Sequence, residues 1–130
     1  MAIKKDKLSD EQKAELERLR PFLVRQGLMS KMNAGNWRSA LDAILAIEGY
    51  TPLYRLRQVR DSGDPPAGLW SGPLPAGLPL YNFIEWLELN PRPAGKTDWS
   101  APLLAALQGA GIPVSQTATG IRINAYQRTK

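Results

Sequence analysis

The order of apolar and polar positions along the chain predicts helices and strands in turn. Apolar residues recur at helical spacing in three segments that follow capping residues. Helices are therefore expected at 10–20, 34–48 and 101–108. Ser9 with Gln12 forms a capping-box signature before the first helix. Pro21 is expected to break or kink that helix because it lacks a backbone donor, and Gly49 is expected to cap the second helix.

The densest apolar run of the chain, Leu78–Leu89, predicts the central strand of a sheet. Bulky residues occupy both parities of this run, which favours an interior strand, although a helix over 80–89 is an open alternative. Glu85 and Glu88 have opposite parity and are expected on opposite faces. A buried Glu85 would need an arginine partner on a neighbouring strand. Further strands are predicted at 53–60, 112–117 and 121–126, the last two as a hairpin.

These elements predict an α+β fold with a single folded domain. A mostly antiparallel sheet of four or five strands would be packed by two or three helices, with an additional helix at the N-terminus. A length of 130 residues suits one domain with its own core. The expected divisions are a disordered tail at 1–8, a helical arm at 9–27 and the α+β domain at 28–130.

The composition removes several kinds of chemistry. Cysteine and histidine are both absent, which excludes Ser-His-Asp and Cys-His catalysis and zinc sites built from these residues. We therefore expect no enzymatic activity, no cofactor and no metal. The acids that lie near one another in the sequence, and that a carboxylate enzyme would use, are Asp61, Asp64, Glu85 and Glu88. Because no apolar run approaches about 20 residues and no signal peptide is evident, we expect a cytoplasmic protein without a membrane partner.

The net charge of +5 favours an acidic protein or a nucleic acid as partner. Arg55 and Arg57 share one face of a predicted strand, where they either grip carboxylates or phosphates or form a solvated sheet face. Trp70 lies in a long loop at 61–79, either as a binding anchor or as a plug on the core. The expected partner-binding residues are Arg55, Arg57, Arg60, Trp70, Arg122 and Tyr126.

Four segments carry a resemblance to a known kind of domain. They are Met32-Asn33 with Asn36-Trp37-Arg38 at a helix start, an Ile-Glu-Trp strand, the run Gly-Ile-Pro-Val and an Ile-Arg-Ile-x-x-Tyr tail, at 32–38, 83–89, 111–114 and 120–126. The chain resembles a small bacterial domain family of unknown function, with a layout similar to immunity proteins of polymorphic-toxin systems. The resemblance implies a non-catalytic protein that binds and neutralises a cognate toxin. A nucleic-acid-binding protein with an arginine-rich sheet face is the alternative.

Overall fold

A computed structural model describes residues 9–128 of the chain. The tail expected at 1–8 lies outside these residues. The described chain forms two compact units, one containing the residues up to Met29 together with Arg128, and the other spanning Ser30–Gln127. Each unit is described by itself.

The smaller unit is built on α1 (Asp10–Gln26), with β1 (Leu28–Ser30) following it. The predicted capping box is confirmed, because Ser9 accepts from the backbone of Gln12 and the Gln12 side chain accepts from the backbone of Ser9. The prediction that the helix ends near residue 20 is wrong, because Pro21 lies inside it. An interior proline removes one backbone hydrogen bond and crowds the preceding turn, yet the helix continues to Gln26. It is closed by Gly27, whose φ of 67° is left-handed and whose N–H reaches two helix carbonyls. Strand β1 was not predicted.

The larger unit contains two of the predicted helices and the predicted sheet. Its helices and strands are α2 (Ala34–Leu45), β2 (Tyr54–Gln58), the 3-10 turn η2 (Tyr81–Phe83), β3 (Ile84–Leu89), α3 (Ser100–Gly109), β4 (Val114–Gln116), β5 (Ile121–Asn124) and β6 (Tyr126–Arg128), the last of which ends at the boundary of the unit. Helix α2 ends earlier than predicted, at a C-cap on Ala46 rather than Gly49. The segment in the eighties is a strand, as predicted, although its first part forms η2.

The four-stranded sheet has the order β2-β3-β5-β4, and every neighbouring pair is antiparallel. The α+β fold class is confirmed. Strand β3 is interior, as its two-sided bulk predicts. The predicted hairpin is formed by β4 and β5.

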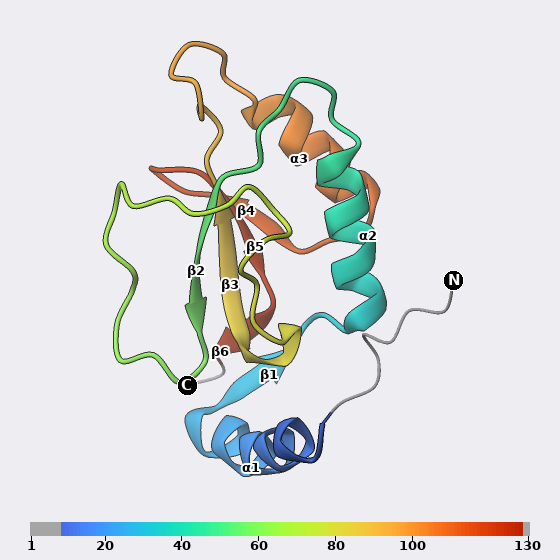
Figure 1. Cartoon of the computed structure of the whole chain (residues 1–130), viewed down its shortest axis with the longest axis vertical. Helices are drawn as coiled ribbons and strands as arrows, with labels where there is room; N and C mark the ends of the chain where they lie inside the picture. The colour runs from blue at the N-terminus through green and yellow to red at the C-terminus, as the bar shows by residue number, and fades with distance from the viewer. Residues whose placement is uncertain (1–8, 129–130) are drawn as a thin grey trace. The chain divides into compact units, whose positions relative to one another are not determined.

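The apolar core lies on one face of this sheet, which we call the inner face. Figure 1 shows α2 and α3 together on this side of the strands. Apolar side chains at every second position of the strands meet the apolar stripes of both helices, so water is excluded between the layers. The residues that join this cluster include Trp37, Ala40, Ile44, Tyr54, Leu87, Leu89, Leu103, Leu107, Ile121 and Ile123.

A bulge in β3 changes which side chains lie on the face of the sheet opposite the inner face. Arg57 pairs with Trp86 whereas the next residue, Gln58, pairs with Ile84, so Glu85 is an additional residue in β3. An additional residue breaks the alternation and brings two successive side chains to the same face. The prediction that Glu85 and Glu88 point to opposite faces is therefore wrong, because parity was counted without the bulge.

Candidate functional site

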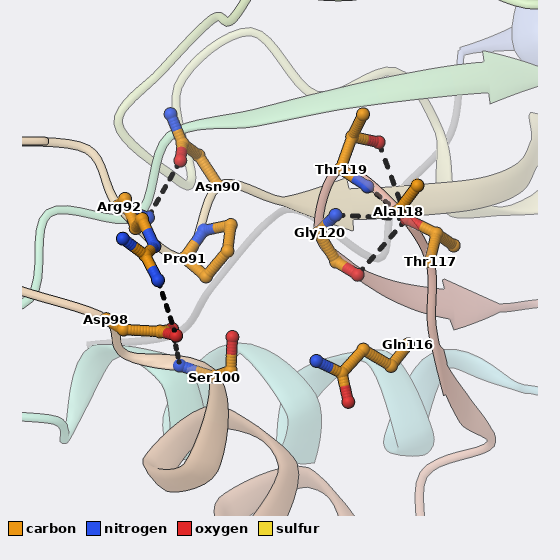
Figure 2. Close-up of a pocket in the computed structure, with 10 residues that line it drawn as sticks. All are labelled: Asn90, Pro91, Arg92, Asp98, Ser100, Gln116, Thr117, Ala118, Thr119 and Gly120. Atoms are coloured by element: carbon orange, nitrogen blue, oxygen red, sulfur yellow. Dashed lines mark hydrogen bonds and ion pairs between the residues drawn. The ribbon is translucent and has the colours of Figure 1, made fainter.

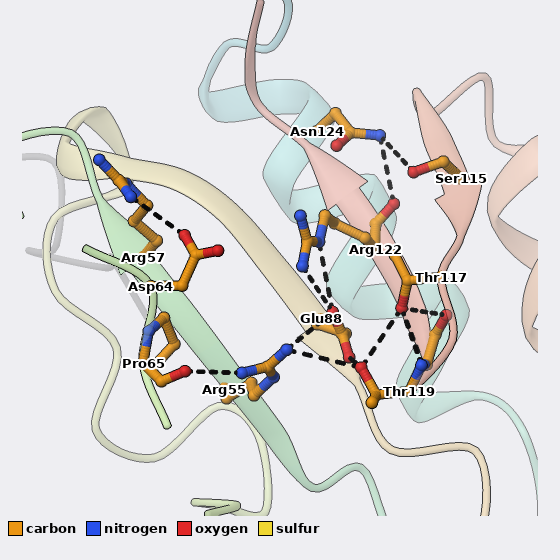
Figure 3. A network of polar contacts seen from close by, with 11 residues as sticks. Arg55, Arg57, Asp64, Pro65, Glu88, Ser115, Thr117, Thr119, Arg122 and Asn124 are labelled. Carbon is orange, nitrogen blue, oxygen red and sulfur yellow. Dashed lines mark hydrogen bonds and ion pairs between the residues drawn. The ribbon is translucent and has the colours of Figure 1, made fainter. Parts of the chain in front are cut away.

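The face of the sheet that points away from α2 and α3, here the outer face, carries charged and aromatic side chains. Arg55 lies opposite Glu88, and Glu88 lies opposite Arg122 on the next strand. Arg57 and Trp86 form the neighbouring pair one step along. Three strands therefore bring together Arg55, Glu88 and Arg122, which are 33 to 67 positions apart in the sequence. Figure 3 shows Arg55, Arg122 and Thr119 converging on Glu88, while Arg57 reaches Asp64.

Glu88 is the centre of the site and is fully buried. Its Oε1 accepts from Nε and Nη2 of Arg122 at 3.2 and 3.0 Å, and from Nη2 of Arg55 at 3.5 Å. Its Oε2 accepts from the hydroxyl of Thr119. Burial by itself would raise the pKa of Glu88, but the hydrogen bonds from Thr119 and Arg122 and the charge of Arg55 outweigh it and lower that pKa. Glu88 is therefore held ionised as a counter-ion.

Trp86 forms a platform between two of the arginines. The guanidinium carbon of Arg122 lies 3.8 Å from the centre of its ring, and that of Arg55 lies 5.4 Å away. Trp70 from the long loop approaches Arg55 at 5.9 Å. The Nε atom of Arg55 is buried without a hydrogen-bond partner, and the two indoles supply the favourable surroundings that its charge otherwise lacks.

Arg57 contacts two further acidic side chains, Glu85 and Asp64, at the outer face. Its Nε donates to Glu85 at 3.1 Å, which is the cross-strand pairing that a buried Glu85 was expected to need. Its Nη1 contacts Asp64 at 3.0 Å and its Nη2 donates to the carbonyl of Asp61 at 3.1 Å. These acids are thus distributed around Arg57, and among residues 9–128 no group of three or more acids is arranged to hold a metal ion.

The long loop after β2 is fastened to that strand along much of its course. Arg55 donates to the carbonyl of Pro65 at 2.8 Å. Tyr54 and Ser71 exchange backbone hydrogen bonds at 2.9 and 2.7 Å, and the Tyr54 hydroxyl donates to Ala76 at 2.6 Å. Between these anchors Leu69 is 64% exposed. The loop is an ordered structure that presents an apolar side chain.

The structure brings four of the six predicted partner-binding residues onto or over the outer face: Arg55, Arg57, Arg122 and Trp70. Arg60 follows β2 and lies 4.6 Å from the ring of Phe83. Tyr126 is in β6, and its hydroxyl donates to the carbonyl of Asn82 at 2.7 Å. Trp70 lies beside Arg55, and whether it also serves as a binding anchor or as a plug on the core stays open.

Sequence reasoning missed the roles of Glu88, Trp86 and Thr119. The sequence shows two arginines on one strand and two glutamates on another, but pairing them requires the strand register. Thr119 was read as part of a turn, and that turn is what places its hydroxyl over Glu88. Only the pairing of Glu85 with an arginine could be predicted from the sequence, because a carboxylate within an apolar run needs a partner once it is buried.

A polar cavity of about 290 Å³ adjoins this network (Figure 2). It lies between the N-terminus of α3 and the β4–β5 turn. Arg92 and Asp98 pair across one wall at 3.2 Å, and Asp98 also accepts from the backbone of Ser100. On the other wall, the Thr117 hydroxyl oxygen accepts from two backbone amides of the turn. Arg92, Asp98 and Thr117 are thus already bonded to other residues that line the cavity.

Over residues 9–128, no helix has the length and apolar character that a membrane crossing requires. No curated protein and no solved structure matches this chain. A family model does match, over residues 19–130, and so covers the sheet, both of its helices and the whole outer face. The chain belongs to a family of unknown function (DUF6678).

Proposed function

We propose that this chain is a non-catalytic protein-binding module that holds its partner with the loop at 61–77 and the adjoining outer face. The observation that carries the proposal is the anchored loop with an exposed leucine. Long loops inside compact domains are uncommon and frequently carry function. This loop is held by Arg55, Arg57 and Tyr54, and Leu69 projects between the anchors.

The anchoring matters because association costs free energy when it immobilises a flexible segment. Here the hydrogen bonds to Pro65, Ser71 and Ala76 hold the loop before any partner arrives. A partner that covers Leu69 therefore gains the burial of an apolar side chain at a smaller ordering cost. Arginine and tryptophan, the residue types next to the loop, are also those that contribute most at protein interfaces.

The state of the carboxylates supports binding over proton transfer. Glu88 is buried, its oxygens are bonded to Arg122, Arg55 and Thr119, and its pKa is lowered. A general acid at neutral pH needs a raised pKa and an accessible proton. Glu85 is likewise bonded to Arg57. These glutamates position the arginines, which is a role suited to a rigid recognition surface.

The finer proposal is that the partner is a toxin, which the chain neutralises as an immunity protein. Its support is the resemblance of the segments at 32–38, 83–89, 111–114 and 120–126 to domains with the layout of immunity proteins. The alternative, nucleic-acid binding through the sheet arginines, is less well supported. Arg55, Arg57 and Arg122 each contact a carboxylate, which reduces the charge that a phosphate backbone would meet.

The test compares two exposed leucines in pull-downs from the source cells. Leu69 is 64% exposed on the loop, and Leu45 is 50% exposed at the end of α2, on the helix side of the sheet. We expect Leu69→Ser to reduce recovery of the partner at least about tenfold, and Leu45→Ser to leave it unchanged. Both variants should unfold at the wild-type temperature, because exposed positions usually change stability by less than about 0.5 kcal/mol.

Each protein that the wild type recovers is then purified and its binding to the wild type and the two variants is measured. The same protein is also expressed in cells with and without this chain. Partners that Leu69→Ser retains as well as the wild type contradict the proposed surface. Growth arrest by the partner that co-expression of the chain relieves supports the toxin proposal. A partner that is not toxic would still support a protein-binding module but would contradict the immunity function.

A further inference from the structure

Arg122 differs from the other outer-face arginines in how its charge is presented. Its side chain is 24% exposed, whereas its counter-ion Glu88 is completely buried. Arg55 is itself buried, and Arg57 shares its charge with Asp64, which is 60% exposed. At Arg122 an approaching molecule therefore meets a guanidinium without meeting its carboxylate.

The bonds of this guanidinium leave one edge available. Nε and Nη2 both donate to the same oxygen of Glu88, and the ring of Trp86 covers one flat side at 3.8 Å. Among residues 9–128, none forms a hydrogen bond or ion pair with Nη1. Because each terminal nitrogen carries two hydrogens, the edge formed by Nη1 and the outer hydrogen of Nη2 can donate two parallel bonds.

Resting on the proposed function, we propose that this edge of Arg122 receives an acidic side chain of the partner protein. A carboxylate matches the spacing of the two donors and accepts both bonds at once. Glu88 and Trp86 hold the guanidinium in place, so little side-chain freedom is lost on binding. The amide of Asn124, which donates to Ser115 at 3.1 Å, makes the adjacent surface polar rather than charged.

A protein carboxylate fits better than a nucleic-acid phosphate. Binding of a phosphate backbone draws on several cations in a row, each of which neutralises one phosphate. Here the neighbouring arginines are compensated by Glu85, Glu88 and Asp64, which leaves one guanidinium edge without a hydrogen bond, on a side chain that is 24% exposed. A single bidentate site is suited to one acidic residue in an interface.

The experiment uses a displayed library of random peptides, selected on the immobilised wild-type protein. We expect the selected peptides to share an acidic residue. Their affinity should fall at least about tenfold for Arg122→Gln. In this variant Arg55 still pairs with Glu88, so the buried site keeps no unpaired charge that would unfold the domain, and circular dichroism checks the fold.

Two further variants make the result specific. Arg38→Gln removes an exposed arginine from α2, on the helix side, and should bind the peptides like the wild type. Arg122→Lys keeps the charge but loses the two-pronged edge, so it should bind more weakly than the wild type. A mixed-sequence DNA duplex serves as the phosphate probe and should not bind with dependence on Arg122.

The outcomes separate this inference from the proposed function. Peptides whose binding depends on Leu69 but not on Arg122 would support the protein-binding module and overturn the carboxylate site. Peptides that depend on Arg122 but not on Leu69 would support the carboxylate site and remove the loop from the interface. DNA binding that requires Arg122, selected peptides without an acidic residue, or no retained peptide would each overturn the inference.

Discussion

Two neighbouring residues of β3, Leu87 and Glu88, are both fully buried but on opposite faces of the sheet. Leu87 faces α2 and α3 and packs in an apolar cluster. Glu88 faces the other way and is enclosed by Arg55, Arg122 and Thr119. The inner face depends on filled volume, whereas the outer face depends on every charged partner being present. Burial therefore follows from two different kinds of interaction within one strand.

The largest expected effect comes from removing the central charge. Glu88→Ala should destabilise the domain by about 3–5 kcal/mol, because Arg55 is left buried without its counter-ion. Leu87→Ala should cost about 2–5 kcal/mol through lost packing and a cavity. Urea unfolding followed by circular dichroism measures both.

A triple replacement distinguishes the two mechanisms. If Arg55, Glu88 and Arg122 are all replaced by methionine or leucine, stability should return to near the wild-type value, since buried ion sets are often exchanged for apolar residues without loss. No such rescue should follow for Leu87→Ala. A triple variant as unstable as Glu88→Ala would show that the outer face is not a balanced charge set.

The second prediction concerns Gly120, in the turn that carries Thr119. A Cβ added at Gly120 would lie 2.3 Å from the carbonyl oxygen of Leu89 and 3.0 Å from Cγ of Glu88. Gly120→Ala should therefore destabilise the domain by about 1–3 kcal/mol through overpacking. Gly63→Ala is the matched control, because nothing lies within 4 Å of its added Cβ. Equal stability of the two variants would contradict this account of the turn.

The inner face could be predicted from the sequence far better than the outer face. Apolar periodicity located α2, α3 and the strand in the eighties, because alternation and helical spacing are local properties. The outer face depends on the register between β2, β3 and β5 and on a bulge at Glu85, and neither leaves a local signal. Arg55, Arg57 and Arg122 were singled out for their charge, and an arginine partner was expected for Glu85, but the pairing of Glu88 with Arg55 and Arg122 could not be predicted.

The smallest expected effect is a difference in acid sensitivity. The folded-state pKa of Glu88 is lowered from its ordinary value of 4.5. Its stabilising contribution is therefore complete above about pH 4.5 and is lost as the pH falls through the lower folded value. Thr119 donates to the carboxylate, and Arg122 and Arg55 lose their counter-ion once it is protonated.

Glu88→Gln carries an amide that does not titrate, so it should be less stable than the wild type at pH 7. Below pH 4 the gap between the two proteins should narrow, as the wild-type carboxyl also becomes neutral. Urea unfolding of both proteins across this range gives the gap at each pH, and other acids titrate alike in both, so the difference isolates Glu88. A gap that stays constant would mean that the site does not depend on the charge of Glu88, and the outer face would then resemble the inner face in being held by shape alone.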